Sequence, residues 1–231
     1  MMMTLSGKIG LLADSHGNLP ATIAAIHCLQ ENGAEQLYHL GDLFDSVRNN
    51  EFMSVLNTLC NNCVIGIKGN NDHQVAQSLV KDTSAGLSAE DREFVVQYLQ
   101  KMPMKQNIGP ICLAHSLPYE NIRALYEPMD DGTTSRAEQV FQDTDYFLTC
   151  CGHSHQPMLF RWRSGEVYRE PISQKYLIPF SALERYILIV GSVDNGECGL
   201  LDFDRWIYQR FRIDENGNGR AHSAGKSNNE K

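Results

Sequence analysis

Residues 8–18 read KIGLLADSHGN, an apolar run that ends in a polar, glycine-containing turn. The run Lys8–Ala13 is short and bounded by turn signals, which predicts a buried strand. The next segment, Leu19–Asn32, carries apolar residues at helical spacing and predicts a helix. Asn18 is a candidate N-cap for this helix, and Gly33 is a suitable residue for its end.

The same strand–loop–helix rhythm continues along the first third of the chain. Gln36–Leu40 predicts a second strand, Asn49–Leu59 a second helix and Cys63–Ile67 a third strand. This alternation predicts an α/β fold that begins with parallel, right-handed connections. Further on, we expect helices at Ser88–Lys101 and Ser135–Gln142, and strands at Ile111–Ala114, Tyr146–Cys150, Met158–Trp162, Tyr186–Val190, Leu200–Phe203 and Arg205–Arg212.

Length and composition indicate one ordinary globular domain. The chain has 231 residues, of which 42% are hydrophobic and 21% charged. A chain of this size lies below the point at which a single core tends to split, so we expect one domain over residues 1–213. Residues 214–231 contain mostly polar residues and glycine, which predicts a disordered C-terminal tail.

The charge balance narrows the possible partners. Lys plus Arg number 20 and Asp plus Glu number 28, which gives a net charge of −8. This balance argues against nucleic-acid binding, although an anionic substrate remains compatible if bound metal supplies positive charge. No apolar run is long enough to span a bilayer or to form the core of a signal peptide. We therefore expect a cytoplasmic protein without membrane association.

The cysteine pattern agrees with a reducing compartment. Seven cysteines are present, and Cys150 and Cys151 are adjacent, which suits buried thiols better than a disulfide framework. Cys60-x-x-Cys63 admits zinc or redox chemistry, but no second cysteine pair completes a zinc site. A packed cysteine at the start of a strand is the favoured interpretation of Cys63.

Side chains able to bind metal follow five of the predicted strands. Open α/β sheets bind ligands at the carboxyl ends of their strands, so we expect these side chains to converge. Each short motif is weak alone, but five in chain order at strand ends indicate a functional site. They are Asp14-x-His16, Gly41-Asp42-x-x-Asp45, Gly69-Asn70-Asn71-Asp72, His115 and Gly152-His153-x-His155.

This series of motifs resembles the pattern D-x-H, G-D-x-x-D, G-N-x-D, H and G-H-x-H of the calcineurin-like metallophosphoesterases. The resemblance extends from Lys8 to Asp204. Gly191-Ser192-Val193 followed by Leu200–Asp202 is similar to the closing segment of the bacterial and archaeal phosphodiesterase-like branch. The resemblance implies a four-layer αββα sandwich with two mixed β-sheets flanked by helices, whereas the periodicity alone predicts only α/β.

The resemblance also implies two divalent metal ions and a set of ligands. One ion would be held by Asp14, His16, Asp42 and His155, and the other by Asp42, Asn70, His115 and His153, with Asp42 as the bridge. Imidazole and oxygen ligands together suit Mn, Fe, Zn or Ni. The implied reaction is hydrolysis of a small phosphorylated substrate by a hydroxide that bridges the two ions. The residues implied in catalysis are Asp42, Asn71, Asp72 and His115.

One position departs from the family pattern. Many members have histidine where this chain has Asn71, and that histidine contacts the leaving group or acts as general acid. An amide cannot give up a proton near neutral pH, so Asn71 favours phosphodiesters over monoesters. His73 lies two residues further on, and we expect it to point away. His39 precedes the turn at Asp42 and is expected to be packed or to support a ligand.

Several alternatives remain open from the sequence. Asp72 either orients a ligand or a catalytic imidazole, or caps a turn; Asp45 admits the same two interpretations. The chain is a phosphodiesterase, a protein-interaction scaffold on the same fold, or a hydrolase of dinucleoside polyphosphates or other phosphoanhydrides. The seven complete ligand positions favour an enzyme over a scaffold. The physiological substrate, the identity of the metal and a possible homo-oligomeric state are left open. Three irregular stretches that could wall a substrate pocket are Met104–Gln106, Leu117–Asp131 and Arg161–Lys175.

Overall fold

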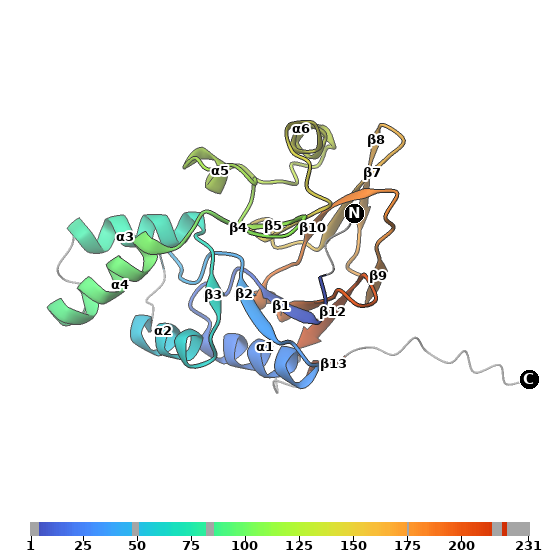
Figure 1. The fold of residues 1–231 in the computed structure, drawn as a ribbon. Helices are drawn as coiled ribbons and strands as arrows, with labels where there is room; N and C mark the ends of the chain where they lie inside the picture. Colours follow the sequence, from blue (N-terminus) through green and yellow to red (C-terminus); the bar gives the residue numbers. More distant parts are fainter. Residues whose placement is uncertain (1–4, 48–50, 82–85, 175, 214–218, 221–231) are drawn as a thin grey trace, which may run out of the picture.

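The computed structural model describes residues 5–47, 51–81, 86–174, 176–213 and 219–220. Within these residues, two β-sheets pack face to face and helices cover their outer faces (Figure 1). This arrangement is the four-layer αββα sandwich that the family resemblance implies.

The first sheet contains seven strands in the order β13-β12-β11-β1-β2-β3, with β9 paired to β12. The strands β1, β2 and β3 are parallel, which confirms the predicted parallel start. The strand β11 pairs with β1 in the antiparallel sense, from Lys8 opposite Asp202 to Leu11 opposite Gly199. The bounds are β1 (Lys8–Leu12), β2 (Gln36–His39), β3 (Ile65–Gly66), β9 (Leu177–Pro179), β11 (Glu197–Asp202), β12 (Ile207–Ile213) and β13 (Gly219–Arg220).

The second sheet contains six strands in the order β4-β5-β6-β10-β7-β8. The central strands β5, β6 and β10 are parallel, and β7 and β8 form an antiparallel hairpin beside them. The bounds are β4 (Lys105–Ile108), β5 (Ile111–Ala114), β6 (Leu148–Cys151), β7 (Met158–Arg163), β8 (Glu166–Pro171) and β10 (Arg185–Ile189).

The helices lie outside the two sheets. In Figure 1, α1 and α2 lie below the first sheet, α5 and α6 lie above the second, and α3 and α4 lie side by side next to β3. The side chain of Asn18 accepts a hydrogen bond from the Ala21 N–H, so the predicted N-cap of α1 is confirmed. The bounds are α1 (Leu19–Glu31), α2 (Phe52–Asn61), α3 (Asn70–Lys81), α4 (Ala89–Lys101), α5 (Arg123–Tyr126), α6 (Ser135–Asp143) and the short 3₁₀ turn η1 (Val193–Asn195).

Three apolar clusters fill the spaces between the four layers. Alternate residues of β1 enter different clusters: Leu11 packs between the two sheets, and Leu12 packs against the helices below. The strand β7 divides in the same way, since Leu159 faces the first sheet while Phe160 packs in the cluster that contains α6 residues. A strand buried on both faces has a continuous apolar sequence, which explains why KIGLLA has no polar alternation.

Some features of the fold differ from the sequence expectations. The strand β8 falls in a stretch predicted to be irregular, and β4 begins in another. Both are edge strands with mostly exposed or half-exposed side chains, so they lack an apolar pattern. The helix α3 begins at Asn70, in the motif predicted as a loop. Cys60 and Cys63 are both exposed, so the interpretation of Cys63 as a packed cysteine is wrong.

The predicted tail at 214–231 lies outside the described residues except for Gly219 and Arg220, which pair with Ile213 and Arg212 at the edge of the first sheet. Among the helices that the structure describes, none combines the length and the apolar character that a membrane span requires.

Candidate metal centre

The loops after β1, β2 and β3 of the first sheet meet the loops after β5 and β6 of the second. Two main-chain N–H groups of the loop after β6 make hydrogen bonds at this junction. The Gly152 N–H donates to the His115 carbonyl at 2.9 Å within the second sheet. The His153 N–H donates to the Asp14 carboxylate at 2.9 Å across the two sheets. The predicted site therefore lies where both sheets end, and both sheets contribute to it.

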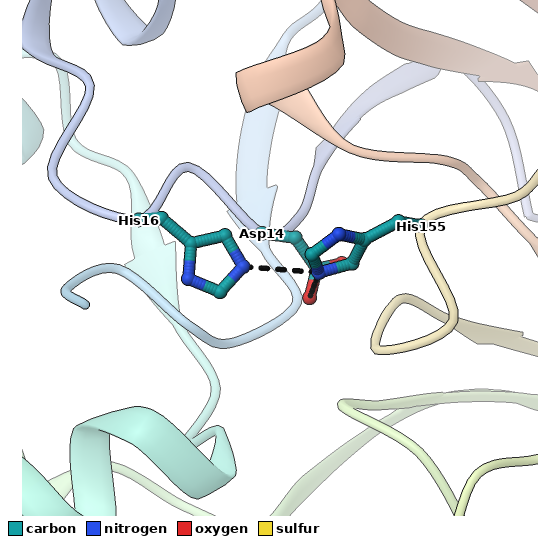
Figure 2. A group of neighbouring side chains, drawn as sticks. All are labelled: Asp14, His16 and His155. Carbon is teal, nitrogen blue, oxygen red and sulfur yellow. Dashed lines mark hydrogen bonds and ion pairs between the residues drawn. The ribbon is translucent and has the colours of Figure 1, made fainter. Parts of the chain in front are cut away.

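Asp14, His16 and His155 form the first cluster of possible metal ligands (Figure 2). The Nε2 atoms of His16 and His155 lie 3.0 Å apart, and His155 Nε2 lies 3.3 Å from Asp14 Oδ1. Asp14 is fully buried, whereas the two imidazoles are partly exposed. The hydrogen bond to Asp14 raises the pKa of His155, against the effect of burial.

Asp42, His115 and His153 form the second cluster, and Asn70 adds an amide oxygen to it. His115 Nε2 lies 3.0 Å from His153 Nδ1 and 3.5 Å from Asp42 Oδ1. Asn70 Oδ1 lies 2.9 Å from both imidazole nitrogens. The structure thus brings together all seven side chains predicted to be ligands, in two adjoining groups.

The hydrogen bonding of the second cluster fits a bound cation. His115 Nδ1 lies 2.8 Å from the Leu40 carbonyl oxygen, which can only accept, so Nδ1 carries the proton in a neutral ring. Burial opposes but does not outweigh the charges of Asp42 and Asp14, which raise the pKa of His115, so this ring must give up a proton before a cation binds. In the neutral ring, the lone pair of Nε2 faces Asn70 Oδ1. Burial and the charge of His115 lower the pKa of His153 to about 4, so this ring is neutral near pH 7. Converging lone pairs repel one another unless a positive ion lies between them, and imidazole with oxygen is a donor set for a transition metal.

Asp72 supports the second cluster through the main chain. Its fully buried carboxylate accepts hydrogen bonds from four N–H groups at 2.9–3.3 Å. These bonds fix the loop that carries Asp42, so Asp72 holds the backbone of a candidate ligand in place. Burial, and then the charge of Asp42, raise the pKa of Asp72 to about 7. The four donors are the main-chain N–H groups of Asp42, Leu43, Phe44 and Gly69.

Asn71 contacts the Asp42 carboxylate with two groups. Its side-chain Nδ2 donates to Asp42 Oδ2 at 2.7 Å, and its main-chain N–H donates to Asp42 Oδ1 at 2.9 Å. Its Oδ1 accepts from the Ser46 N–H at 3.2 Å. Burial would raise the pKa of Asp42, but the charge of His115 and the hydrogen bonds from Asn71 together outweigh it and lower this pKa. Both ends of the Asn71 amide are therefore occupied by the protein.

Five of the candidate ligands have a left-handed backbone. Eight described residues other than glycine have positive φ, and five of these eight belong to the two clusters. Such strain at non-glycine residues gathers at functional sites. No sequence pattern marks it, because it results from contacts between distant loops. The five φ values are 53° for Asp14, 47° for His16, 57° for Asp42, 65° for His153 and 56° for His155.

The glycines beside the ligands are needed for close approach. A Cβ atom at Gly69 would lie 2.1 Å from Asp42 Oδ1, and one at Gly152 would lie 2.3 Å from Asp14 Oδ2. Contacts this short do not occur for real Cβ atoms. These two motif glycines therefore make room for the carboxylates.

The structure also places the residues whose roles were left open. His39 is fully buried beneath the site with Nε2 2.9 Å from Ser15 Oγ, so it is a packed histidine. Asp45 Oδ2 lies 3.9 Å from Nδ1 of the candidate ligand His16, and its Oδ1 accepts a hydrogen bond from the Val47 N–H. Asp45 therefore both faces the candidate site and closes a turn.

Three further residues near the site are not marked by residue type or spacing in the sequence. Ser192 Oγ donates to the Asp14 carbonyl at 2.8 Å. Asp194 accepts from Asn18 Nδ2 at 2.9 Å, which ties η1 to the start of α1. Tyr126 Oη lies 2.8 Å from His73 Nδ1 and 3.5 Å from the Asn70 carbonyl. Only the resemblance of Gly191-Ser192-Val193 to a family segment points toward the first of them.

Comparisons with known proteins agree with this fold. The model of the calcineurin-like phosphoesterase superfamily domain matches residues 8–171, and the chain belongs to this superfamily. The fold is similar to that of a metallophosphoesterase from Sphaerobacter thermophilus, with TM-score 0.70 and 20% identity over 91% of this chain and 89% of that chain. It is also similar to a cold-active protein-tyrosine phosphatase of a psychrophilic Shewanella species, with TM-score 0.56 and 13% identity over 94% of this chain and 80% of that chain. No curated protein matches the sequence.

Proposed function

We propose that this protein is a two-metal hydrolase of phosphodiesters. The observation that carries the proposal is the convergence of seven nitrogen and oxygen ligands in two adjoining clusters. Membership of the phosphoesterase superfamily supports hydrolysis of a phosphorylated substrate. In this proposal Asp14, His16 and His155 hold one ion, and Asn70, His115 and His153 hold the other.

Asp42 is the proposed shared ligand of the two ions. It groups with His115 and His153, and its carboxylate is held in place by both donors of Asn71. When bound, two divalent ions would neutralise charge on the phosphoryl oxygens and lower the pKa of a water molecule. Four positive charges would exceed the two negative charges of Asp14 and Asp42, so the centre would attract an anionic phosphate despite the net charge of −8.

The preference for diesters rests on Asn71. An alkyl monoester requires a proton for its departing oxygen, and a placed general acid contributes roughly 10²–10⁴-fold. Asn71 cannot supply that proton, and its amide already binds Asp42 and the Ser46 N–H. An aryl diester requires this help least, since its phenolate is a stable leaving group.

The test is hydrolysis by protein that has been stripped with a chelator and then loaded with Mn²⁺, Fe²⁺, Zn²⁺ or Ni²⁺ in turn. Bound metal is counted by mass spectrometry, and kcat/KM is measured for bis(p-nitrophenyl) phosphate, for an alkyl monoester such as glycerol 2-phosphate and for a phosphoanhydride. We expect two ions per chain, metal-dependent turnover and the highest kcat/KM for the diester.

Variants in the site and away from it complete the test. Asp42→Asn should abolish turnover, whereas Glu90→Gln, which removes an exposed carboxylate on α4, should not. Full activity of metal-free protein would contradict the two-metal mechanism. Two bound ions without hydrolysis of any substrate would favour the scaffold, and a higher kcat/KM for the anhydride would contradict the preference for diesters.

A further inference from the structure

A groove with a volume of about 470 Å³ lies along α3 and α4, next to the metal centre. Its walls include Lys68, His73, Gln77, Val80, Lys81 and Leu99. None of the candidate ligands or proposed catalytic residues lines this groove, so the proposed reaction at the metal centre does not account for it.

The inner end of the groove adjoins the metal centre through two contacts. His73 lines the groove, and its Nδ1 lies 2.8 Å from Tyr126 Oη. The same hydroxyl lies 3.5 Å from the carbonyl oxygen of Asn70, a candidate ligand. From His73 the groove follows α3 to Lys81, a distance of about 12 Å at the rise of an α-helix. The groove therefore begins two contacts away from Asn70 and extends along α3 away from it.

The charge of the groove differs from that of the whole molecule. The protein carries −8, yet the described residues that line the groove include two lysines and no carboxylate. Lys68 Nζ donates to the Gln100 carbonyl at 3.0 Å, which holds this cation at the wall, while Lys81 is exposed at the outer end. The positive charge of these two lysines would be complemented by an anionic ligand.

The remaining wall is apolar. Val80 on α3 is 62% exposed, and Leu99 on α4 is buried. A valine exposed to this extent beside two lysines suits a ligand that carries both an apolar surface and negative charge.

We propose that this groove binds one arm of the substrate, and that this arm carries a second anionic group. The inference rests on the proposed function, because the scissile phosphate is taken to lie at the metal centre. The proposed substrate is a diester with a further phosphate or other anion beyond the scissile bond. Its apolar part packs on Val80, and the anion contacts Lys68 and Lys81.

Two dinucleotides that differ only in their terminal groups test this proposal. TpT has one phosphate, and pTpTp has an additional phosphate at each end, so either arm that enters the groove carries one. The metal-loaded protein is assayed for kcat/KM with each, and dissociation constants are measured by calorimetry. We expect a higher kcat/KM for pTpTp than for TpT. This ratio should fall about tenfold in the double variant Lys68→Gln/Lys81→Gln, because each charged contact contributes on the order of a few-fold to tenfold in affinity.

Lys101→Gln is the matched control, because Lys101 is an exposed lysine of α4 that does not line the groove. Lys101→Gln should keep the wild-type preference for pTpTp over TpT. The hydrolysis of bis(p-nitrophenyl) phosphate should be unchanged in every lysine variant. If Lys68→Gln impairs folding, Lys81→Gln alone should still lower the preference. An equal preference in all variants would overturn the groove proposal while leaving the proposed function intact. If no diester is hydrolysed, the proposed function fails, and the two dissociation constants still decide whether the lysines bind the terminal phosphate.

Discussion

At the scale of single residues, the candidate metal centre contains backbone strain. His16 and four other candidate ligands adopt positive φ although none is glycine. The left-handed conformation costs an L-residue roughly 1–2 kcal/mol relative to glycine. Strain of this kind persists only where surrounding contacts impose it, and here it aims imidazoles and carboxylates at common points.

This strain predicts an unusual order of stability among His16 variants. Both His16→Gly and His16→Ala remove the imidazole, but only glycine relieves φ of 47°. We expect metal-free His16→Gly to be more stable than His16→Ala by about 1 kcal/mol, the reverse of the order in a helix. Urea denaturation of both variants measures the difference. A more stable alanine variant would show that the backbone at this position is not strained.

His39 predicts a dependence of stability on pH. Burial lowers its pKa from the ordinary 6.5 to about 3. Between these values the unfolded chain binds a proton that the native protein does not, so the free energy of unfolding falls as pH decreases from about 6.5 toward 3. We expect His39→Gln to reduce this slope in metal-free protein, as measured by urea denaturation at several pH values.

His27 offers the matched control for this titration. It lies exposed on α1, so His27→Gln should leave the slope unchanged. Equal slopes for wild type and His39→Gln would mean that His39 is not the group that resists protonation.

At the scale of elements, the positions of the ligands depend on where strands and helices end. The helix α3 starts at Asn70, directly after Gly69, and its first turn carries Asn70, Asn71 and Asp72 toward the loop of Asp42. Gly69 must lack a side chain because Asp42 occupies the space of its Cβ. The junction between β3 and α3 is therefore a fixed spacer within the site.

Gly69→Ala should weaken metal binding more than it weakens the fold. The new Cβ would displace the Asp42 carboxylate, so we expect a loss of about tenfold or more in metal affinity, comparable to the loss of a supporting hydrogen bond. Gly66→Ala is the control, because its Cβ would meet the flexible end of Met102 at 3.0 Å. Competition with a chelating dye measures both affinities. Equal affinities in the two variants would contradict the spacer role of Gly69.

The elements also show what the sequence could and could not predict. The strand β5 lies at the predicted residues Ile111–Ala114, because a strand buried on both faces needs a continuous apolar run. The edge strand β4 has no such run, because its side chains largely face solvent. The side chains of the two candidate clusters were predictable from residue type at strand ends. The bond from Asn71 to Asp42 was not, because it joins residues that only the folded loops bring together.

At the scale of the whole molecule, the metal centre connects the two sheets. Asp14 follows β1 and Asp42 follows β2 in the first sheet, whereas His115 and His153 follow β5 and β6 in the second. Under the proposed function, two ions held by these side chains would cross-link the sheets at one end of the sandwich. Metal binding would then stabilise the native state, since no such site exists in the unfolded chain.

Removal of metal should therefore lower Tm. At a free metal concentration of 100 times Kd, one site contributes about 2.7 kcal/mol to the free energy of unfolding. We expect chelator-treated wild-type protein to melt several degrees lower than the loaded protein, with recovery on addition of Mn²⁺. Scanning calorimetry measures both transitions. Asp42→Asn should show a much smaller difference, and an identical Tm with and without bound metal in the wild type would exclude a cross-linking role.

The pairing of β1 with β11 has a consequence for biosynthesis. The Ala13 carbonyl accepts from the Val193 N–H, and the Asp14 carbonyl accepts from Ser192 Oγ. Some 180 residues separate these partners, which takes a ribosome roughly ten to forty seconds to translate. During this time the nascent segment Asp14–Gly17 already carries the candidate metal-binding atoms of Asp14 and His16. The residues that set the geometry of these atoms have not yet been made. Under the proposed function, correct metal loading would accordingly wait until Ser192 and Val193 have left the ribosome.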